Sequence, residues 1–161
     1  TFIILFWQHL SRRHISNIAQ ISTGTEGVAE PILAEDKKVF NQIRLLMEQE
    51  QRFLHHDLKT IDIANALQVS EYRISRAIRA MSAAANVNQF INSYRISYAK
   101  QLLTSHQSEH WTILVISMES GFASLAPFNR AFKASEGCTP NQYRQRYMSK
   151  ETVTNNPVVP Y

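Results

Sequence analysis

The sequence contains two copies of one short pattern, and this repeat limits the fold more than any other feature. The first copy is TIDIANALQVSEYRISRAIRAM at residues 60–81, and the second is TILVISMESGFASLAPFNRAFKA at residues 112–134. When Ser70 is aligned with Ser124, apolar residues fall at matching positions, provided that the second turn is one residue longer. Two copies are too few for a solenoid, so they indicate two related small modules.

Each copy is predicted to form a short helix, a tight turn and a second helix. Ser70 and Ser124 stand at the N-cap of the second helix, where their hydroxyls can accept hydrogen bonds from first-turn amides. We expect Gly121 to adopt the positive φ that ends the earlier helix of the second copy. The sequence therefore predicts two helix-turn-helix units, over about 58–82 and 112–136.

The second helix of each unit has an apolar face and a polar face. Ile74 and Ile78, and likewise Phe128 and Phe132, are predicted to face inward. The opposite faces carry Tyr72, Arg73, Ser75, Arg76 and Arg79 in the first copy and Asn129, Arg130 and Lys133 in the second. A helix with such a polar face fits the major groove of DNA, where Arg can donate two hydrogen bonds to guanine.

The remainder of the chain is also expected to be helical, which makes the predicted fold class all-α. Only four glycines and five prolines occur in 161 residues, a composition that favours helices. Val39, Ile43, Leu46 and Met47 recur at helical spacing. They predict a leading helix within 34–54, with Glu35 and Asp36 near its positive end.

A long helix is predicted to link the two units, over about 86–105, with Asn86 or Asn88 as its cap. One apolar stripe is expected to run along it, formed by Val87, Phe90, Ile91, Tyr94, Ile96, Ala99 and Leu102. A final helix is expected at 140–148. Residues 149–161 lack a helical period and are expected to be a disordered tail.

Residues 1–33 are interpreted as the tail of an upstream segment followed by a linker. The apolar run TFIILFW is too short to span a bilayer, and basic residues follow it, unlike in a signal peptide. It is either the start of an amphipathic helix or the end of a membrane helix, with Arg12 and Arg13 on the cytoplasmic side. Residues 16–33 are small and polar, as in a linker.

The charge balance indicates an anionic partner. The formal net charge is +4, and residues 60–148 alone hold nine Lys and Arg against five Asp and Glu. The basic excess therefore lies in the repeated units, and it suits either nucleic acid or a membrane surface. The alternative to DNA binding is a basic helical module that contacts membranes or proteins, which would require a broad exposed apolar stripe beside the cations.

Catalytic and metal-binding patterns are not found in the sequence. Cys138 is the only cysteine, so no intrachain disulfide can form, and its neighbours suggest a loop. His106 and His110 have the spacing of helical metal ligands but lack a third ligand nearby. No phosphate-binding loop or nucleophile elbow is present. We therefore expect no enzyme activity, cofactor, metal or small-molecule site in this chain.

The segment from Ile113 to Arg144, with FNRAFK and GCTPNQYR, resembles the signature of the AraC/XylS family of bacterial transcription regulators. NQFINSYRISYAKQLL resembles the linker helix of that family, and the resemblance covers about 55–148. It implies a DNA-binding domain of two helix-turn-helix subdomains joined by a long helix. The two recognition helices would then enter successive major-groove segments of double-stranded DNA.

By position, the resemblance implies that Tyr72, Ser75 and Arg76 contact bases, with Arg73 and Arg79 nearer phosphates. In the second unit it implies contacts from Leu125, Ala126, Asn129 and Arg130, and Ser124 and Lys133 complete the expected DNA-binding set. The family commonly has polar residues at 125–127, whereas this chain has Leu125, Ala126 and Pro127. Apolar side chains can contact a thymine methyl group but cannot hydrogen-bond, which leaves base recognition by the second unit open.

Some members of that family carry a membrane-spanning sensor upstream. The resemblance therefore implies that this chain is the cytoplasmic output domain of a regulator tethered to the inner membrane, and it favours activation over repression. An upstream membrane sensor and RNA polymerase are the partners expected besides DNA.

Overall fold

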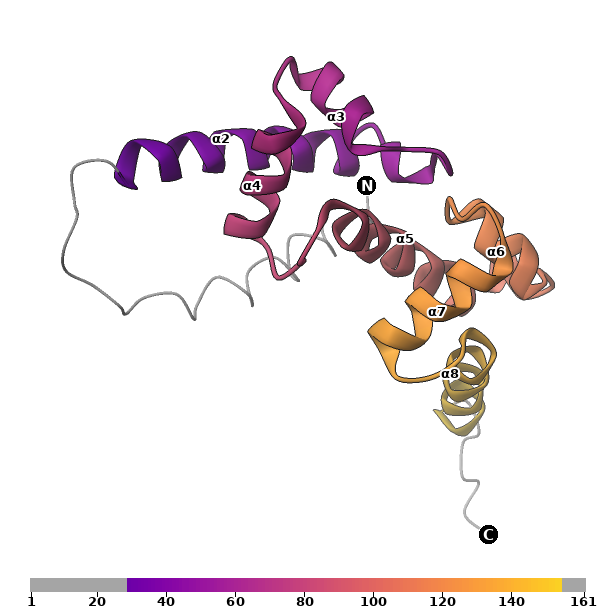
Figure 1. Cartoon of the computed structure of the whole chain (residues 1–161). Coiled ribbons are helices and arrows are strands. Elements are labelled where there is room, and N and C mark those ends of the chain that lie inside the picture. Colours follow the sequence, from indigo (N-terminus) through magenta and orange to yellow (C-terminus); the bar gives the residue numbers. More distant parts are fainter. Residues whose placement is uncertain (1–28, 155–161) are drawn as a thin grey trace, which may run out of the picture.

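The structure is a computed structural model that describes residues 29–154, and the regular secondary structure of this part is all helical (Figure 1). The helices are α2 (Ala29–Glu48), α3 (Thr60–Leu67), α4 (Glu71–Met81), α5 (Val87–Thr104), α6 (Ile113–Glu119), α7 (Leu125–Glu136) and α8 (Pro140–Thr154). Short 3-10 turns, η2 (Arg52–Leu54) and η3 (His106–Ser108), follow α2 and α5. The predicted all-α class with two helix-turn-helix subdomains, α3–α4 and α6–α7, is confirmed.

Helix α2 differs from the predicted leading helix at both ends. It begins at Ala29, inside the segment expected to be a linker, and it ends at Glu48 rather than near 54. Pro31 lies in its first turn, where a missing amide hydrogen is tolerated. Glu35 and Asp36 are therefore about two turns inside the helix and not at its positive end.

The proposed membrane segment and most of the expected linker lie in residues 1–28, outside the described residues. None of the helices between residues 29 and 154 is long and apolar enough to cross a bilayer.

The hydrophobic core has two parts, one for each unit. The first joins α2, α3, α4 and the beginning of α5, and the second joins the end of α5 to α6 and α7. Ile74, Ile78, Phe128 and Phe132 are each 0% exposed, which confirms their predicted inward orientation. The ring of Phe128 lies 5.2 Å from that of Phe122 and 5.6 Å from that of Phe132 between centroids.

The predicted single apolar stripe along α5 is wrong, because the helix buries two different faces. Val87, Phe90, Ile91 and Tyr94 belong to the first part of the core, whereas Ile96, Ala99 and Leu103 belong to the second. At about 100° per residue these two sets lie on opposite sides of the helix. Leu103 takes the buried place expected for Leu102, which is only partly buried. The two units therefore pack against opposite sides of α5, as Figure 1 shows.

The two units meet around a buried arginine of α5. Arg95 is 8% exposed and donates from Nε to the carbonyl of Phe53 and from Nη2 to the carbonyl of His55, each at 2.7 Å. Its guanidinium also lies 5.5 Å from the centroid of the Phe122 ring. Arg95 thus connects the chain before the first unit to the turn of the second unit.

Gly121 makes the same junction possible through its lack of a side chain. Its φ is +83°, as expected for the residue that ends the earlier helix of the second unit. A Cβ atom at this position would lie 2.5 Å from the carbonyl oxygen of Phe53 and 2.9 Å from the Cα of Leu54. The sequence indicates the turn, but the close approach of the two segments is evident only in the structure.

The last helix is longer than predicted. At its start, Thr139 N donates to Gln142 Oε1 at 3.0 Å, and Gln142 N donates to Thr139 Oγ1 at 3.3 Å, which forms a capping box. The helix continues to Thr154, so residues 149–154 are helical and are not part of a disordered tail. The rest of that expected tail, 155–161, lies outside the described residues.

We expect Gly121→Ala to lower the free energy of unfolding by about 2–4 kcal/mol, because strain at positive φ adds to overlap with the backbone of Phe53. Gly137→Ala is the matched control: its φ is +70°, but no atom of the described residues lies within 4 Å of the added Cβ. The control should lose about 1–2 kcal/mol from strain alone. Urea unfolding measures both, and equal losses would contradict a tight junction.

Candidate nucleic-acid interface

Helix α4 is held by a tight turn and a buried apolar face. Gln68 ends α3 in the left-handed conformation with φ +54°, the conformation that glycine usually supplies. Ser70 begins α4 as predicted, and its Oγ accepts from the amide of Arg73 at 3.4 Å. Ile74, Ala77 and Ile78 are fully buried beneath the helix. This packing determines which side of α4 faces away from the protein.

The outward side of α4 carries the residues predicted from the sequence. Tyr72 is 65% exposed and Arg79 is exposed, whereas Arg73, Ser75 and Arg76 are half-buried. Tyr72, Ser75, Arg76 and Arg79 follow helical spacing along one face. The structure therefore brings these four candidate residues together on a single surface.

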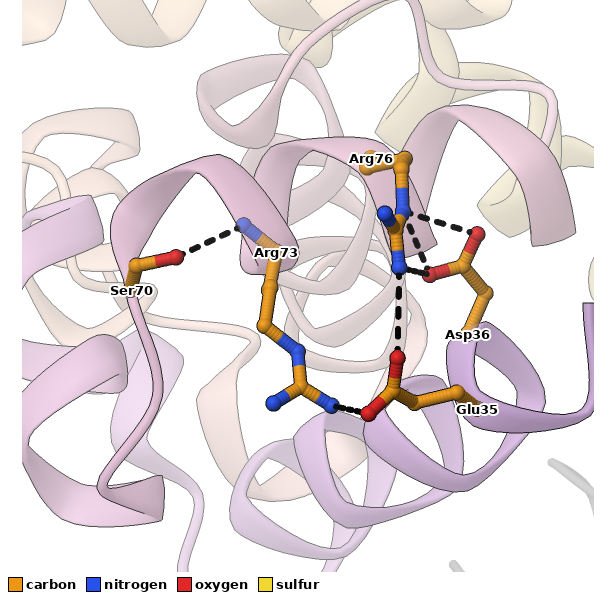
Figure 2. Close-up of polar contacts among 5 residues, drawn as sticks. All are labelled: Glu35, Asp36, Ser70, Arg73 and Arg76. Carbon is orange, nitrogen blue, oxygen red and sulfur yellow. Dashed lines mark hydrogen bonds and ion pairs between the residues drawn. The ribbon is translucent and has the colours of Figure 1, made fainter. Parts of the chain in front are cut away.

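Two of the candidate arginines contact α2, which the sequence does not predict. Arg76 Nε donates to Asp36 Oδ1 at 2.8 Å and to Oδ2 at 3.1 Å. Arg73 forms an ion pair with Glu35, and Figure 2 shows both carboxylates pointing from α2 toward the two arginines of α4. The hydrogen bond that Asp36 accepts raises the pKa of Arg76 above its ordinary value. Asp36 is 4% exposed, so this partner is built into the packing between the helices.

Helix α7 begins differently from α4. Ser124 has the extended backbone of an N-cap residue, but its hydroxyl accepts no capping hydrogen bond, which corrects the sequence prediction. The corresponding bond in the first unit comes from the third residue of the helix, and in the second unit that residue is Pro127, which has no amide hydrogen. The expected donor is therefore absent by sequence.

The outward side of α7 matches that of α4 position by position. Ala126, Asn129, Arg130 and Lys133 are exposed, and they correspond to Tyr72, Ser75, Arg76 and Arg79 when the two N-cap serines are aligned. Leu125, which was predicted to contact DNA, is half-buried and packs against the second part of the core. Each unit therefore presents one short helix face, and the second face is less aromatic and more exposed.

A shallow hollow lies beside the outward face of α4. It is lined mainly by polar side chains from the starts of α3 and α5 and from α4, namely Thr60, Ser75, Arg79, Asn86 and Asn88. Asn86 caps α5 by accepting from Gln89 N at 2.9 Å, so the sequence-predicted cap is confirmed. The hollow is continuous with the candidate interface through Ser75 and Arg79.

The two histidines with metal-ligand spacing do not share a helix. His106 lies in η3, and His110 follows this turn rather than sharing a helix with it. Across residues 29–154, no group of three or more His, Cys, Asp or Glu side chains could hold a metal ion. Cys138 is 5% exposed within the second unit.

Sequence reasoning missed or misplaced three residues at the candidate interface, namely Asp36, Glu35 and Pro127. Pro127 was recognisable, because an N-cap serine followed three residues later by proline has lost its usual donor. The partners of Asp36 and Glu35 were not recognisable, since Asp36 and Arg76 are 40 residues apart.

Known proteins resemble the part of the chain that contains the two helix-turn-helix units. Residues 63–146 match a family model described as a helix-turn-helix domain. An HTH-type transcriptional regulator of Staphylococcus aureus is 34% identical over 115 residues, which cover 71% of this chain and 14% of the relative. The chain thus spans only a small part of the length of that relative.

Two solved structures share the arrangement of helices. The C-terminal domain of AraT, a response regulator from Geobacillus stearothermophilus, has a TM-score of 0.54 and 27% identity, and the match covers 72% of this chain and 85% of that domain. A transcriptional regulator of Chromobacterium violaceum, described as AraC-type, has a TM-score of 0.51 and 21% identity. That second match covers 74% of this chain and 94% of the other, and at this identity it concerns the fold alone.

The two N-cap serines give a paired prediction. Ser70→Ala should lower the free energy of unfolding by about 1 kcal/mol, because it removes the bond to the Arg73 amide. Ser124→Ala should change it by less than about 0.5 kcal/mol, because no capping bond is lost. Urea unfolding of both variants tests this, and a larger loss at Ser124 would refute the role assigned to Pro127.

Proposed function

The chain belongs to the AraC-type helix-turn-helix family of transcriptional regulators, and on this premise we propose that it binds double-stranded DNA sequence-specifically through two recognition helices, α4 and α7. The observation that carries the proposal is the match between the outward faces of these helices. Four positions on α4 and four on α7 correspond in spacing, and each set contains at least one arginine. A single surface helix rich in cations would not require such a match.

The junction at Arg95 supports recognition by two helices acting together. The guanidinium of Arg95 and the backbone approach at Gly121 leave little freedom between the units. Two rigidly connected recognition helices would select two base patches at a fixed spacing, about one helical turn or ~10 bp apart. A flexible junction would instead tolerate several spacings.

Each candidate residue has a proposed role in this complex. Arg76 and Arg130 donate to guanine, while Tyr72, Ser75 and Asn129 contact neighbouring base edges. Ala126 and the exposed part of Leu125 contact thymine methyl groups. Arg73, Arg79, Ser124 and Lys133 contact phosphates, and the polar hollow beside Arg79 offers further donors to the same backbone.

The alternative of a membrane-surface module is not favoured by the exposed apolar residues. Trp111, Leu114, Val115 and Met118 are exposed on and before α6, but the charged residue of this helix is Glu119. An anionic lipid surface would require Lys or Arg beside such a stripe. This surface instead suits contact with a protein.

The same proposal includes activation of transcription and contact with RNA polymerase. It also includes an upstream membrane sensor that tethers the domain at the cytoplasmic face of the inner membrane. They are supported by the family resemblance and, for a protein contact, by the exposed apolar residues of α6. The sensor and tether would involve residues outside the described part of the chain.

Selection of bound duplexes from a random DNA pool at near-physiological salt tests the proposal. Enrichment of one asymmetric site with two patches about 10 bp apart is the expected result. Enrichment of a single patch would show that α7 does not recognise bases. Weak, salt-dependent retention without enrichment would refute sequence-specific binding.

Substitutions should separate base contacts from phosphate contacts. Arg76→Ala should weaken binding to the selected duplex by about 1–3 kcal/mol and relax the preference at one base position. Lys133→Ala should weaken binding to all duplexes alike. It should also reduce the slope of the logarithm of the binding constant against the logarithm of salt concentration by about one. Arg52→Ala, which removes a cation outside both recognition helices, is the control. Equal losses from Arg76→Ala on selected and random DNA would make Arg76 a phosphate contact.

A further inference from the structure

Arg76 is held on two sides before any DNA is present. Asp36 occupies the edge formed by Nε and Nη2, with Oδ1 2.8 Å from each nitrogen. The ring of Tyr72 covers the guanidinium, with 5.7 Å between Cζ and the ring centroid. None of these contacts uses Nη1. The side chain is still 27% exposed, so part of it remains accessible to a partner.

The position of Asp36 makes this contact unlike an ordinary surface ion pair. Asp36 lies on the buried side of α2, in line with Val39 and Ile43, which are 3% and 0% exposed. Helix α4 crosses and packs against α2 (Figure 1), so the carboxylate is fixed relative to the recognition helix. Exposed ion pairs are weak because both side chains move, whereas here one partner is rigid. A rigid partner reduces the ordering that Arg76 must undergo on binding.

Glu35 extends the same arrangement to a second cation. It forms an ion pair with Arg73, and its Oε2 lies 3.7 Å from Arg76 Nη2. Figure 2 shows the Asp36 carboxylate beside Arg76 and the Glu35 carboxylate between the two arginines. Two negative charges this close to the guanidinium of Arg76 disfavour a phosphate at that side chain. They therefore oppose binding modes in which Arg76 simply follows the DNA backbone.

We propose that Asp36 is a specificity-determining positioning residue. It holds Arg76 in one orientation, so that the N–H groups of Arg76 Nη1 meet the acceptors of a guanine edge. Asp36 does not touch DNA in this scheme and acts through Arg76. The inference rests on the proposed recognition of bases by α4. It adds that the selectivity of this helix depends on a carboxylate supplied by α2.

The test uses the whole chain and the duplex obtained by selection from a random pool. Affinities are measured for that duplex, for its single-base-pair variants and for random duplex, with wild type, Asp36→Asn and Glu48→Gln. Asparagine keeps the size of the aspartate and removes its charge. Glu48→Gln is the matched control, because Glu48 also pairs with an arginine on α2, Arg44 at 3.0 Å.

We expect Asp36→Asn to reduce the ratio of selected to random affinity by about tenfold. Affinity for the selected duplex should fall while affinity for random duplex rises, because an unrestrained Arg76 can follow phosphates. The lost preference should be at the base position that Arg76→Ala relaxes. The double variant Asp36→Asn/Arg76→Ala should show no further loss of preference at that position than Arg76→Ala alone. Glu48→Gln should leave the ratio of selected to random affinity within about twofold of the wild-type value.

Two results would overturn the proposal. An unchanged ratio would show that Asp36 is only a packing partner, and an equal rise in affinity for every duplex would show that it only masks a cation. If Asp36→Asn does not fold by circular dichroism, Asp36→Ala replaces it, because it also removes the carboxylate, and a wild-type ratio in that variant would likewise refute positioning. If wild type enriches no duplex, the proposed function itself fails, together with this inference.

Discussion

The arrangement of the two units depends on the burial of one charged group, the guanidinium of Arg95. Burial lowers the pKa of this group and costs free energy unless hydrogen bonds replace the lost water. The carbonyls of Phe53 and His55 supply these bonds, and the Phe122 ring covers the charge from the second unit. Rotating either unit relative to α5 would leave a buried charge without its partners, so the junction is specific as well as stable.

This junction links the fold to the proposed function. Helix α5 buries opposite faces along its two halves, and this places one unit on each side of it. Each unit then needs only its own small core to orient its recognition helix, through Ile74 and Ile78 in α4 and through Phe128 and Phe132 in α7. The contacts from α2 distinguish the two helices, because α4 receives carboxylates beside its arginines whereas Asn129, Arg130 and Lys133 of α7 are exposed.

Local features were predictable from the sequence where one physical preference was sufficient. The inward residues of α4 and α7, the Asn86 cap and the positive φ of Gly121 all follow from helical periodicity or backbone sterics. The errors arose where two preferences competed. Ser124 suggests a capping bond, but Pro127 removes the donor. The apolar residues of α5 suggest one stripe, but two partners divide them.

The sequence by itself determined the two helix-turn-helix units, their apolar sides and the candidate DNA-facing residues, because a repeated pattern of helical spacing fixes which face of each helix is buried. Only the tertiary structure decided which helix covers which face. The bond from Arg95 to Phe53 spans 42 residues and that from Arg76 to Asp36 spans 40. Periodicity describes neighbours within a few turns of helix, whereas these contacts arise only when separate helices pack together.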